Sequence, residues 1–237
     1  MAVLCHFNNL KVSHADSFGI TKFSGYLSII YGGPTFQRRK VQKYLVMNIN
    51  YSNQGMVKFS MIINLYSVLQ DFPEHLGETA ANPDDEHILK GSDKIKTQDL
   101  LGDQAQTFHH TLSQLIFMSA RTQKWIQTPV ALLTTPVKKQ EDNNWGKLRS
   151  VLKYLKGTYK LKTTLSIGDM VVVKLVVLTS YTENEYWWGH TGYMMSLGKV
   201  EVSSFSKKQN INGEISTEDE LIDVYDNMVK ILWPKTS

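Results

Sequence analysis

Few side chains of this sequence have the spacing that metal or phosphate chemistry requires. His109 and His110 are adjacent, and neighbouring residues of an α-helix point about 100° apart, so they cannot share a metal ion as histidines four residues apart can. The run GHTG at 189–192 has the glycines of a phosphate loop but no following Lys-Ser/Thr and no helix, so a β-hairpin turn explains it better. Spacing alone therefore predicts no metal site.

Basic residues gather between residues 138 and 162, around a segment with helical periodicity. The candidate nucleic-acid-binding residues are Lys147, Arg149, Lys153 and Lys156. Lysine and arginine contact phosphates without reading sequence, and the alternative is an ordinary solvated basic face. Trp145 lies on the apolar stripe of the same segment, so burial explains it better than stacking on a base.

Composition limits the number of domains, the redox compartment and the kinds of partner that we expect for this chain. The chain has 237 residues, 42% of them hydrophobic, enough for one large domain or two small ones. Cys5 is the single cysteine, which excludes an intramolecular disulfide framework and is typical of a reducing compartment. A net charge of +4 neither favours nor excludes nucleic-acid binding. The longest apolar run, 171–178, is interrupted by Lys174 and too short to cross a bilayer. We expect an intracellular protein, cytoplasmic or nuclear and not secreted.

The first part of the sequence predicts hairpins and helices. Short β-prone runs on either side of Asn8 and Asn9, residues that tolerate turn geometry, predict a tight hairpin. Apolar spacing predicts a helix over 17–31, and alternation predicts one strand over 41–51 that turns at 53–55 into a second strand. A polar connection is expected over 74–103. Further helices are predicted around 61–69, at 108–119, after Pro129 and along the stripe of Leu148, Val151, Leu152 and Leu155.

From residue 163 onward the pattern changes to that of strands. The runs TTLSI, VVVKLVVLTSY, GYMMSL and VEVSSFS are followed by STEDE at 216–220, whose capping-box chemistry opens a helix. The expected buried face of this helix consists of Leu221, Val224, Tyr225, Met228 and Leu232. The sequence therefore predicts an α+β chain with two units, residues 1–162 and 163–237.

Several stretches together resemble the end of a copia-type retrotransposon Pol polyprotein. They are WGKLRSVLKYLKGT at 145–158, the run at 189–221, YLVMNINYS where relatives tend to have YLGM, and IQTPVALLT after a tripeptide usually written Arg-Pro-Asp and here Gln123-Lys124-Trp125. The resemblance implies that residues 1–162 are a partial reverse transcriptase with palm hairpins, a connection and thumb-like helices. It implies that residues 163–237 are a truncated ribonuclease H-like unit of three strands and a helix.

The same resemblance identifies degenerate catalytic positions. Asn8 and Asn9 stand where the family's Tyr-Val-Asp-Asp hairpin has its two metal-binding aspartates, and Leu178 stands at the first ribonuclease H aspartate. Glu220 matches the retained helix glutamate of that enzyme. Two-metal phosphoryl transfer needs several carboxylates, and the remaining ones would fall outside residues 1–237. We therefore expect no cofactor, although magnesium would serve the ancestral enzyme.

The function implied is that of a degenerate fragment of Pol, ancestrally an RNA-directed DNA polymerase with ribonuclease H and inactive here. One alternative is a non-catalytic nucleic-acid-binding or assembly module that contacts RNA or DNA weakly and without sequence preference. Another is an enzyme completed by segments supplied in trans. In the ribonuclease H-like fold a further strand follows the helix, so the strand at 171–178 would keep an open edge. We expect self-association through that edge and no membrane partner.

Overall fold

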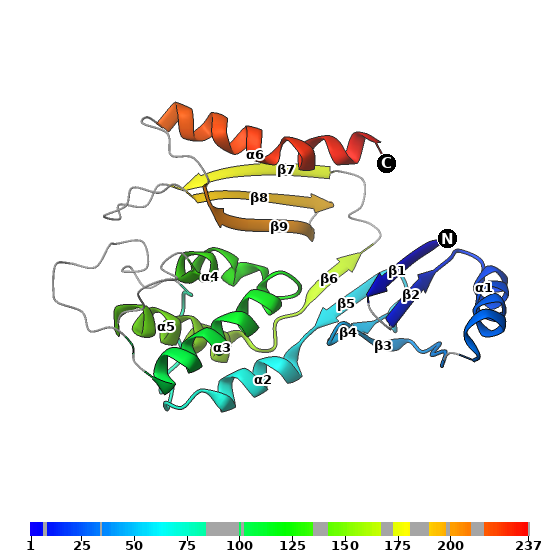
Figure 1. The fold of residues 1–237 in the computed structure, drawn as a ribbon, viewed down its shortest axis with the longest axis horizontal. Coiled ribbons are helices and arrows are strands. Elements are labelled where there is room, and N and C mark those ends of the chain that lie inside the picture. Colours follow the sequence, from blue (N-terminus) through cyan, green and yellow to red (C-terminus); the bar gives the residue numbers. More distant parts are fainter. Residues whose placement is uncertain are drawn as a thin grey trace.

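Figure 1 shows an α+β fold, in which the strands of the described residues form three small antiparallel sheets. This computed structural model describes residues 1–6, 9–33, 35–83, 100, 102–134, 142–166, 173–180, 190–197, 200–209 and 216–236. The predicted class is therefore correct at the level of helices mixed with antiparallel strands.

The N-terminal hairpin pairs β1 (Ala2–His6) with β2 (Asn9–Ser13). His6 lies opposite Asn9, so the chain reverses within two residues and the predicted hairpin is confirmed. Asn8 lies outside the described residues, and Asn9 is the first residue of β2 rather than part of the turn. Every residue of β1 is exposed, and a two-stranded ribbon of this kind adds little stability by itself.

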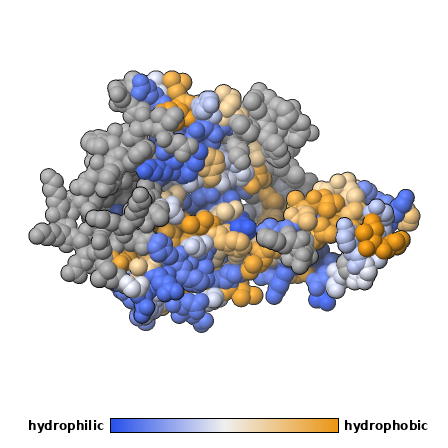
Figure 2. Space-filling view, viewed as in Figure 1, coloured by the Kyte–Doolittle hydropathy of each residue, from blue (hydrophilic) through white to orange (hydrophobic). Residues whose placement is uncertain are grey.

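Helix α1 (Ser17–Tyr31) coincides with the helix predicted over 17–31. The carboxylate of Asp16 caps its first turn by accepting a hydrogen bond from the Phe18 N–H at 3.0 Å. Ser24 and Leu27 are the buried residues of this helix, so most of its apolar positions face solvent. Figure 2 shows them as hydrophobic surface at the right end of the molecule. The exposed large side chains are Phe18, Tyr26, Ile29, Ile30 and Tyr31.

The second sheet corrects the single strand predicted over 41–51. Its strands, in sheet order, are β3 (Val41–Tyr44), β4 (Met47–Asn50), β5 (Met56–Ser60) and β6 (Thr163–Ser166). The chain reverses at Leu45 and Val46, whose φ angles are 48° and 66°. Positive φ at both central residues is the signature of a type I′ hairpin turn, which asparagine and glycine favour. Leucine and valine are not typical turn residues, so the sequence pattern did not indicate this turn. The turn expected at 53–55 is confirmed, with the Met56 N–H donating to the Asn53 carbonyl at 3.1 Å.

A layer of helices holds the main hydrophobic core. The helices are α2 (Ile62–Asp71), α3 (Asp103–Ser119), the 3₁₀ turn η1 (Lys124–Ile126), α4 (Gln127–Thr134) and α5 (Asp142–Thr158). The predicted stripe of Leu148, Val151, Leu152 and Leu155 is confirmed, because all four are 0% exposed. Burying each such side chain stabilises the fold by about 1.5–3 kcal/mol. On α3, Phe108, Leu112 and Leu115 are buried, whereas Ile116 is exposed.

The C-terminal part is an antiparallel sheet followed by a helix, as predicted. The strands β7 (Val173–Ser180), β8 (His190–Leu197) and β9 (Val200–Lys208) pair in chain order, and α6 (Ser216–Thr236) contacts β7 and β8. Within the described residues β7 is an edge strand that pairs with β8. In Figure 1 the helix runs along the β7 side of this sheet.

Helix α6 buries the side opposite to the one that was predicted to be buried. Leu221, Val224, Tyr225 and Met228 were expected to be buried, but they are 65%, 43%, 77% and 42% exposed. The side chain of Leu232, part of the same expected face, lies outside those described. The residues of α6 that are buried against the sheet are Asp219, Asp223 and Asn227.

Hydrogen bonds explain why a polar stripe can be buried. The Asp223 carboxylate accepts from the Thr191 hydroxyl of β8 and, at 3.2 Å, from the Gln209 side-chain amide. Lys207 on β9 forms an ion pair with Asp226 at 3.0 Å between Nζ and Oδ2. Paired polar groups of this kind tolerate burial.

The strand that follows the expected unit boundary belongs to the earlier sheet. β6 begins at residue 163 and pairs with β5, with Phe59 opposite Thr163. The C-terminal sheet in turn packs on the helical layer through contacts between α4 and β9. The chain is therefore tied together on both sides of residue 162.

Candidate nucleic-acid interface

The four basic candidates lie on α5 but do not share one side of it. At about 100° per residue, Arg149, Lys153 and Lys156 fall on one flank of the buried stripe, and Lys147 falls on the opposite flank. All four are half-buried, as expected for long stems that lie along a helix surface. The sequence-based patch is thus a group of three residues with Lys147 apart from it.

Two residues of that group of three make contacts within the protein. Lys156 Nζ donates to the Gly77 carbonyl at 2.8 Å. Arg149 Nε lies 3.6 Å from Glu74 Oε2 in a partly exposed ion pair, which contributes little by itself. Both contacts fasten the segment after α2 to α5. Lys153 is therefore the cleaner probe of nucleic-acid contact, because changing Arg149 or Lys156 would also disturb the fold.

Trp145 takes part in the same attachment. Its ring stacks on Phe72 with 5.0 Å between centroids, and its Nε1–H donates to Glu74 Oε1 at 2.8 Å. The residue is 7% exposed. The prediction that Trp145 is buried rather than free to stack on a base is confirmed.

An aromatic pair that the sequence analysis missed lies where α5 ends; Tyr66 is 46% exposed, and Tyr159 is partly buried against the core. The rings of Tyr66 and Tyr159 are 5.3 Å apart, and Lys160 Nζ lies 5.5 Å from the Tyr159 ring centroid. The hydrogen bond between the two phenols raises the pKa of Tyr66 and lowers the pKa of Tyr159. An exposed ring beside a cation can stack an unpaired base while the cation contacts a phosphate, and Tyr66 is the exposed ring of this pair. Two tyrosines from distant segments give no local sequence signal, so only the fold reveals the pair.

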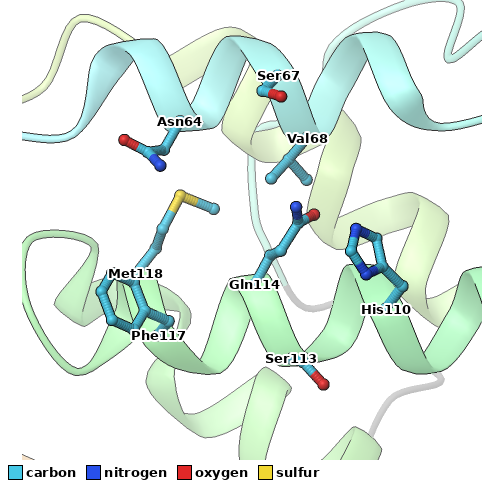
Figure 3. A pocket seen from close by; sticks show the side chains of 8 residues that line it. All are labelled: Asn64, Ser67, Val68, His110, Ser113, Gln114, Phe117 and Met118. Atoms are coloured by element: carbon cyan, nitrogen blue, oxygen red, sulfur yellow. The ribbon is translucent and has the colours of Figure 1, made fainter. Parts of the chain in front are cut away.

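A groove of about 300 Å³ between α2 and α3 is a separate feature (Figure 3). Its lining consists of Asn64, Ser67, Val68, His110, Ser113, Gln114, Phe117 and Met118. Gln114 and Val68 point toward one another across it, whereas Ser113 points away (Figure 3). These residues include no lysine, arginine, aspartate or glutamate, so the groove lacks the charged groups that usually hold phosphates and metals. His110 lines this groove, but His109 does not.

The residues that the resemblance assigns to catalytic positions lie on three elements, of which β7 and α6 contact each other. Leu178 lies on β7 opposite Gly192, and Glu220 lies in an early turn of α6, the helix that packs on β7. The Glu220 side chain is exposed. Asn9 belongs to a different sheet. Among the described residues, no group of three or more His, Cys, Asp or Glu side chains is arranged to hold a metal ion.

The C-terminal sheet contains a buried histidine, which is adjacent along β8 to Thr191, the residue that faces α6. His190 begins β8, opposite Ser180 on one side and Lys208 on the other. Burial, together with the charge of Lys208, lowers the pKa of His190. The imidazole is therefore held in its neutral form to lower pH than an exposed histidine would be.

No protein-family model, curated protein or solved structure matches this chain. In the part of the chain that the structure describes, no helix has the length and apolar character needed to span a membrane.

Proposed function

We propose that this chain is a non-catalytic, degenerate relative of the C-terminal part of a copia-type Pol protein. The observation that carries the proposal is the placement of Leu178 and Glu220 on two elements that pack together. Ribonuclease H chemistry would need a carboxylate from each element to hold two cations, and one of the two is leucine. A single carboxylate at that junction cannot neutralise two divalent ions.

The turn at Val46 supports the family assignment independently. The resemblance gives relatives a glycine in this part of the YLVM motif, and Val46 has a φ of 66°. Glycine adopts positive φ without steric cost, whereas valine does not. A family whose backbone requires this turn would favour glycine there.

Under this proposal, residues 1–162 correspond to the end of a reverse transcriptase and residues 163–237 to a ribonuclease H-like unit. The β1–β2 hairpin holds the degenerate polymerase positions, and β7, β8, β9 and α6 form the core of the second unit. Because β6 pairs with β5, the sheet of the ribonuclease H-like unit starts at β7.

The test is to supply the purified chain with a primed RNA template and, separately, an RNA–DNA hybrid, each with Mg²⁺ or Mn²⁺. We expect neither extension nor cleavage, with an active reverse transcriptase as the positive control. The variants Asn8→Asp with Asn9→Asp, and Leu178→Asp, should remain inactive, because the described residues offer no group of three or more His, Cys, Asp or Glu side chains that could hold a metal ion. Metal-dependent cleavage that disappears in Glu220→Gln would contradict the proposal. Activity that arises only when other segments of a Pol protein are added would favour the enzyme completed in trans.

The second candidate is a nucleic-acid-binding module, and the group of Tyr66, Tyr159 and Lys160, in which Tyr66 and Lys160 are exposed, favours it. Two tyrosine rings beside a lysine form a small stacking platform, and Lys153 lies on the same helix that leads to it. Such a surface would bind single strands weakly and without sequence preference.

Fluorescence anisotropy with single-stranded RNA, single-stranded DNA and a hybrid, over a range of salt concentrations, tests this second function. We expect affinity to fall with salt, and Lys153→Glu to weaken binding more than the matched change Lys147→Glu on the opposite flank. Tyr159→Leu should reduce binding of single strands more than binding of the hybrid. Equal effects of the two lysine variants would assign these residues to an ordinary solvated surface.

A further inference from the structure

The groove between α2 and α3 has an apolar floor and polar walls (Figure 3). Its floor consists of Val68 and Met118, which are 3% and 1% exposed. The walls are the half-buried side chains of Asn64 on α2 and of Gln114 and Phe117 on α3, and the remaining lining residues are exposed at the rim. The volume of about 300 Å³ is at the lower end of the range for ligand sites, so it suits a single flat ring system.

The two side-chain amides of the walls are available to a ligand. Within the described part of the chain no hydrogen bond engages the side chain of Asn64 or Gln114, whereas the rim hydroxyl of Ser67 donates to Asp71 Oδ2 at 3.0 Å. Each amide has a carbonyl acceptor and an N–H donor. A purely apolar ligand would cover these groups without pairing them, which costs free energy. The best ligand therefore carries a donor and an acceptor of its own.

The aromatic wall is held in place by a neighbouring cation. Arg121 lies over the Phe117 ring, with 3.6 Å between the guanidinium carbon and the ring centroid. Its Nη1–H donates to the Phe117 carbonyl at 3.1 Å. A ring fixed in this way is preorganised for a flat partner, because little side-chain entropy is lost when the partner binds.

We propose that this groove binds an adenine base, with the Gln114 amide paired to the N6 amino group and N7 of the base. Carboxamides pair with adenine in this way, whereas guanine is usually read by arginine or lysine and cytosine by a carboxylate. The lining has amides but none of those charged groups. Gln114 points across the groove toward Val68, so a base bonded to it would also contact the apolar floor (Figure 3). Asn64 supplies a further hydrogen bond from the opposite wall.

This site is separate from the tyrosine pair of the second candidate function. Tyr66 is two residues from both Asn64 and Val68, which places it on nearly the opposite side of α2. The inference thus goes beyond the proposed function and does not require a strand to bind at Tyr66. The adenine has two sources to be distinguished, a free nucleoside or nucleotide and an RNA strand.

Ligand-observed NMR titration of the full chain with adenosine, guanosine, cytidine and uridine tests the base preference. We expect adenosine to bind with a dissociation constant of about 1 mM or below, and the other nucleosides about tenfold more weakly. Gln114→Leu and Asn64→Leu should each weaken adenosine binding about tenfold. Gln104→Leu is the matched control, because Gln104 is half-buried on the same helix and does not line the groove. Circular dichroism would verify that each variant folds.

The nucleoside 7-deazaadenosine tests the contact itself, since it lacks the N7 acceptor. It should bind the parent chain about tenfold more weakly than adenosine does, whereas Gln114→Leu should bind the two equally. Gln114→Glu should shift the preference toward cytidine, because a carboxylate accepts from the cytosine amino group. Equal binding of the four nucleosides by the parent chain, or adenosine binding that is undiminished in Gln114→Leu, would overturn the proposal.

Fluorescence anisotropy with a short single-stranded RNA of adenines separates the two sources of the base. Tighter binding of this RNA than of adenosine, lost in Gln114→Leu, would identify a strand as the source. Equal binding of the two would identify a free nucleoside or nucleotide. A chain whose RNA binding responds to Lys153→Glu, but which binds no adenosine, would overturn the groove site and leave the second candidate function intact.

Discussion

Gln127 and Ser204 form a reciprocal pair between α4 and β9. The Gln127 Nε2–H donates to the Ser204 carbonyl at 3.0 Å, and the Ser204 hydroxyl donates to Gln127 Oε1 at 2.6 Å. One side-chain amide thus satisfies both a backbone acceptor and a hydroxyl donor on the C-terminal sheet. This pair lies where the helical layer meets that sheet.

Replacing Gln127 with alanine should therefore loosen the junction. We expect Gln127→Ala to lower the free energy of unfolding by about 1–3 kcal/mol, the cost of leaving partly buried partners unsatisfied. Urea denaturation measures this difference. The neighbouring exposed residue supplies a control, and Thr128→Ala should stay within about 0.5 kcal/mol of the parent chain. Equal stability of the two variants would show that the pair contributes nothing to the junction.

The β3–β4 turn should be improved by glycine. Val46 is 54% exposed and has a φ of 66°, so Val46→Gly loses little burial and removes a left-handed strain of about 1–2 kcal/mol. The greater freedom of glycine in the unfolded chain offsets about 0.5–1 kcal/mol of that gain. Thermal melting should show a net increase in stability. Val46→Ala keeps the Cβ atom and should gain much less; a similar gain would attribute the effect to loss of the valine side chain.

Stability should depend on pH through His190. Its pKa is lowered by burial in the folded chain, so the unfolded chain binds a proton more readily. The free energy of unfolding should then be constant above the ordinary histidine pKa of about 6.5 and decrease as the pH falls below it. Urea denaturation between pH 7.5 and 5.5 would reveal the decrease. His190→Gln should flatten it and His110→Gln, at an exposed histidine, should not; the reverse result would remove His190 as the cause.

Removal of Glu74 should weaken the attachment of the segment after α2. The Glu74→Ala variant leaves the buried Trp145 Nε1–H without its acceptor, and we expect a loss of about 1–3 kcal/mol in urea denaturation. Glu78 is exposed on the same segment, so Glu78→Ala is the matched control and should have little effect. A loss as large in Glu78→Ala would point to a general charge effect.

The helices could be predicted where an apolar stripe meets the common core. The stripe of α5 is the clearest case, because Leu148, Val151, Leu152 and Leu155 have no polar competitor on the same side. The stripe of α6 has the same periodicity but a different outcome. There the polar side is buried, because Asp223 forms hydrogen bonds with residues on β8 and just after β9. Sequence spacing gives no information about such partners.

The candidate interface likewise has some features that sequence spacing predicts and others that depend on the fold. Helical geometry alone could have separated Lys147 from Arg149, Lys153 and Lys156, since their angular positions follow from spacing. The contact between Lys156 and the Gly77 carbonyl could not be anticipated, because it depends on how the segment after α2 folds back. The hairpin at Leu45 and Val46 could not be predicted either, since both residues have apolar side chains that favour a strand.

The pairing of β6 with β5 has a consequence for how the chain acquires its structure during synthesis. Phe59 is synthesised first, and it cannot pair with Thr163 until the intervening helices have been translated. Contacts between such distant residues form late, because closing a long loop costs entropy before the new strand adds hydrogen bonds. Until then the outer edge of β5 is unpaired on the ribosome. We expect the nascent chain to depend most on chaperones, and to aggregate most readily, in the interval between the emergence of residue 60 and that of residue 166.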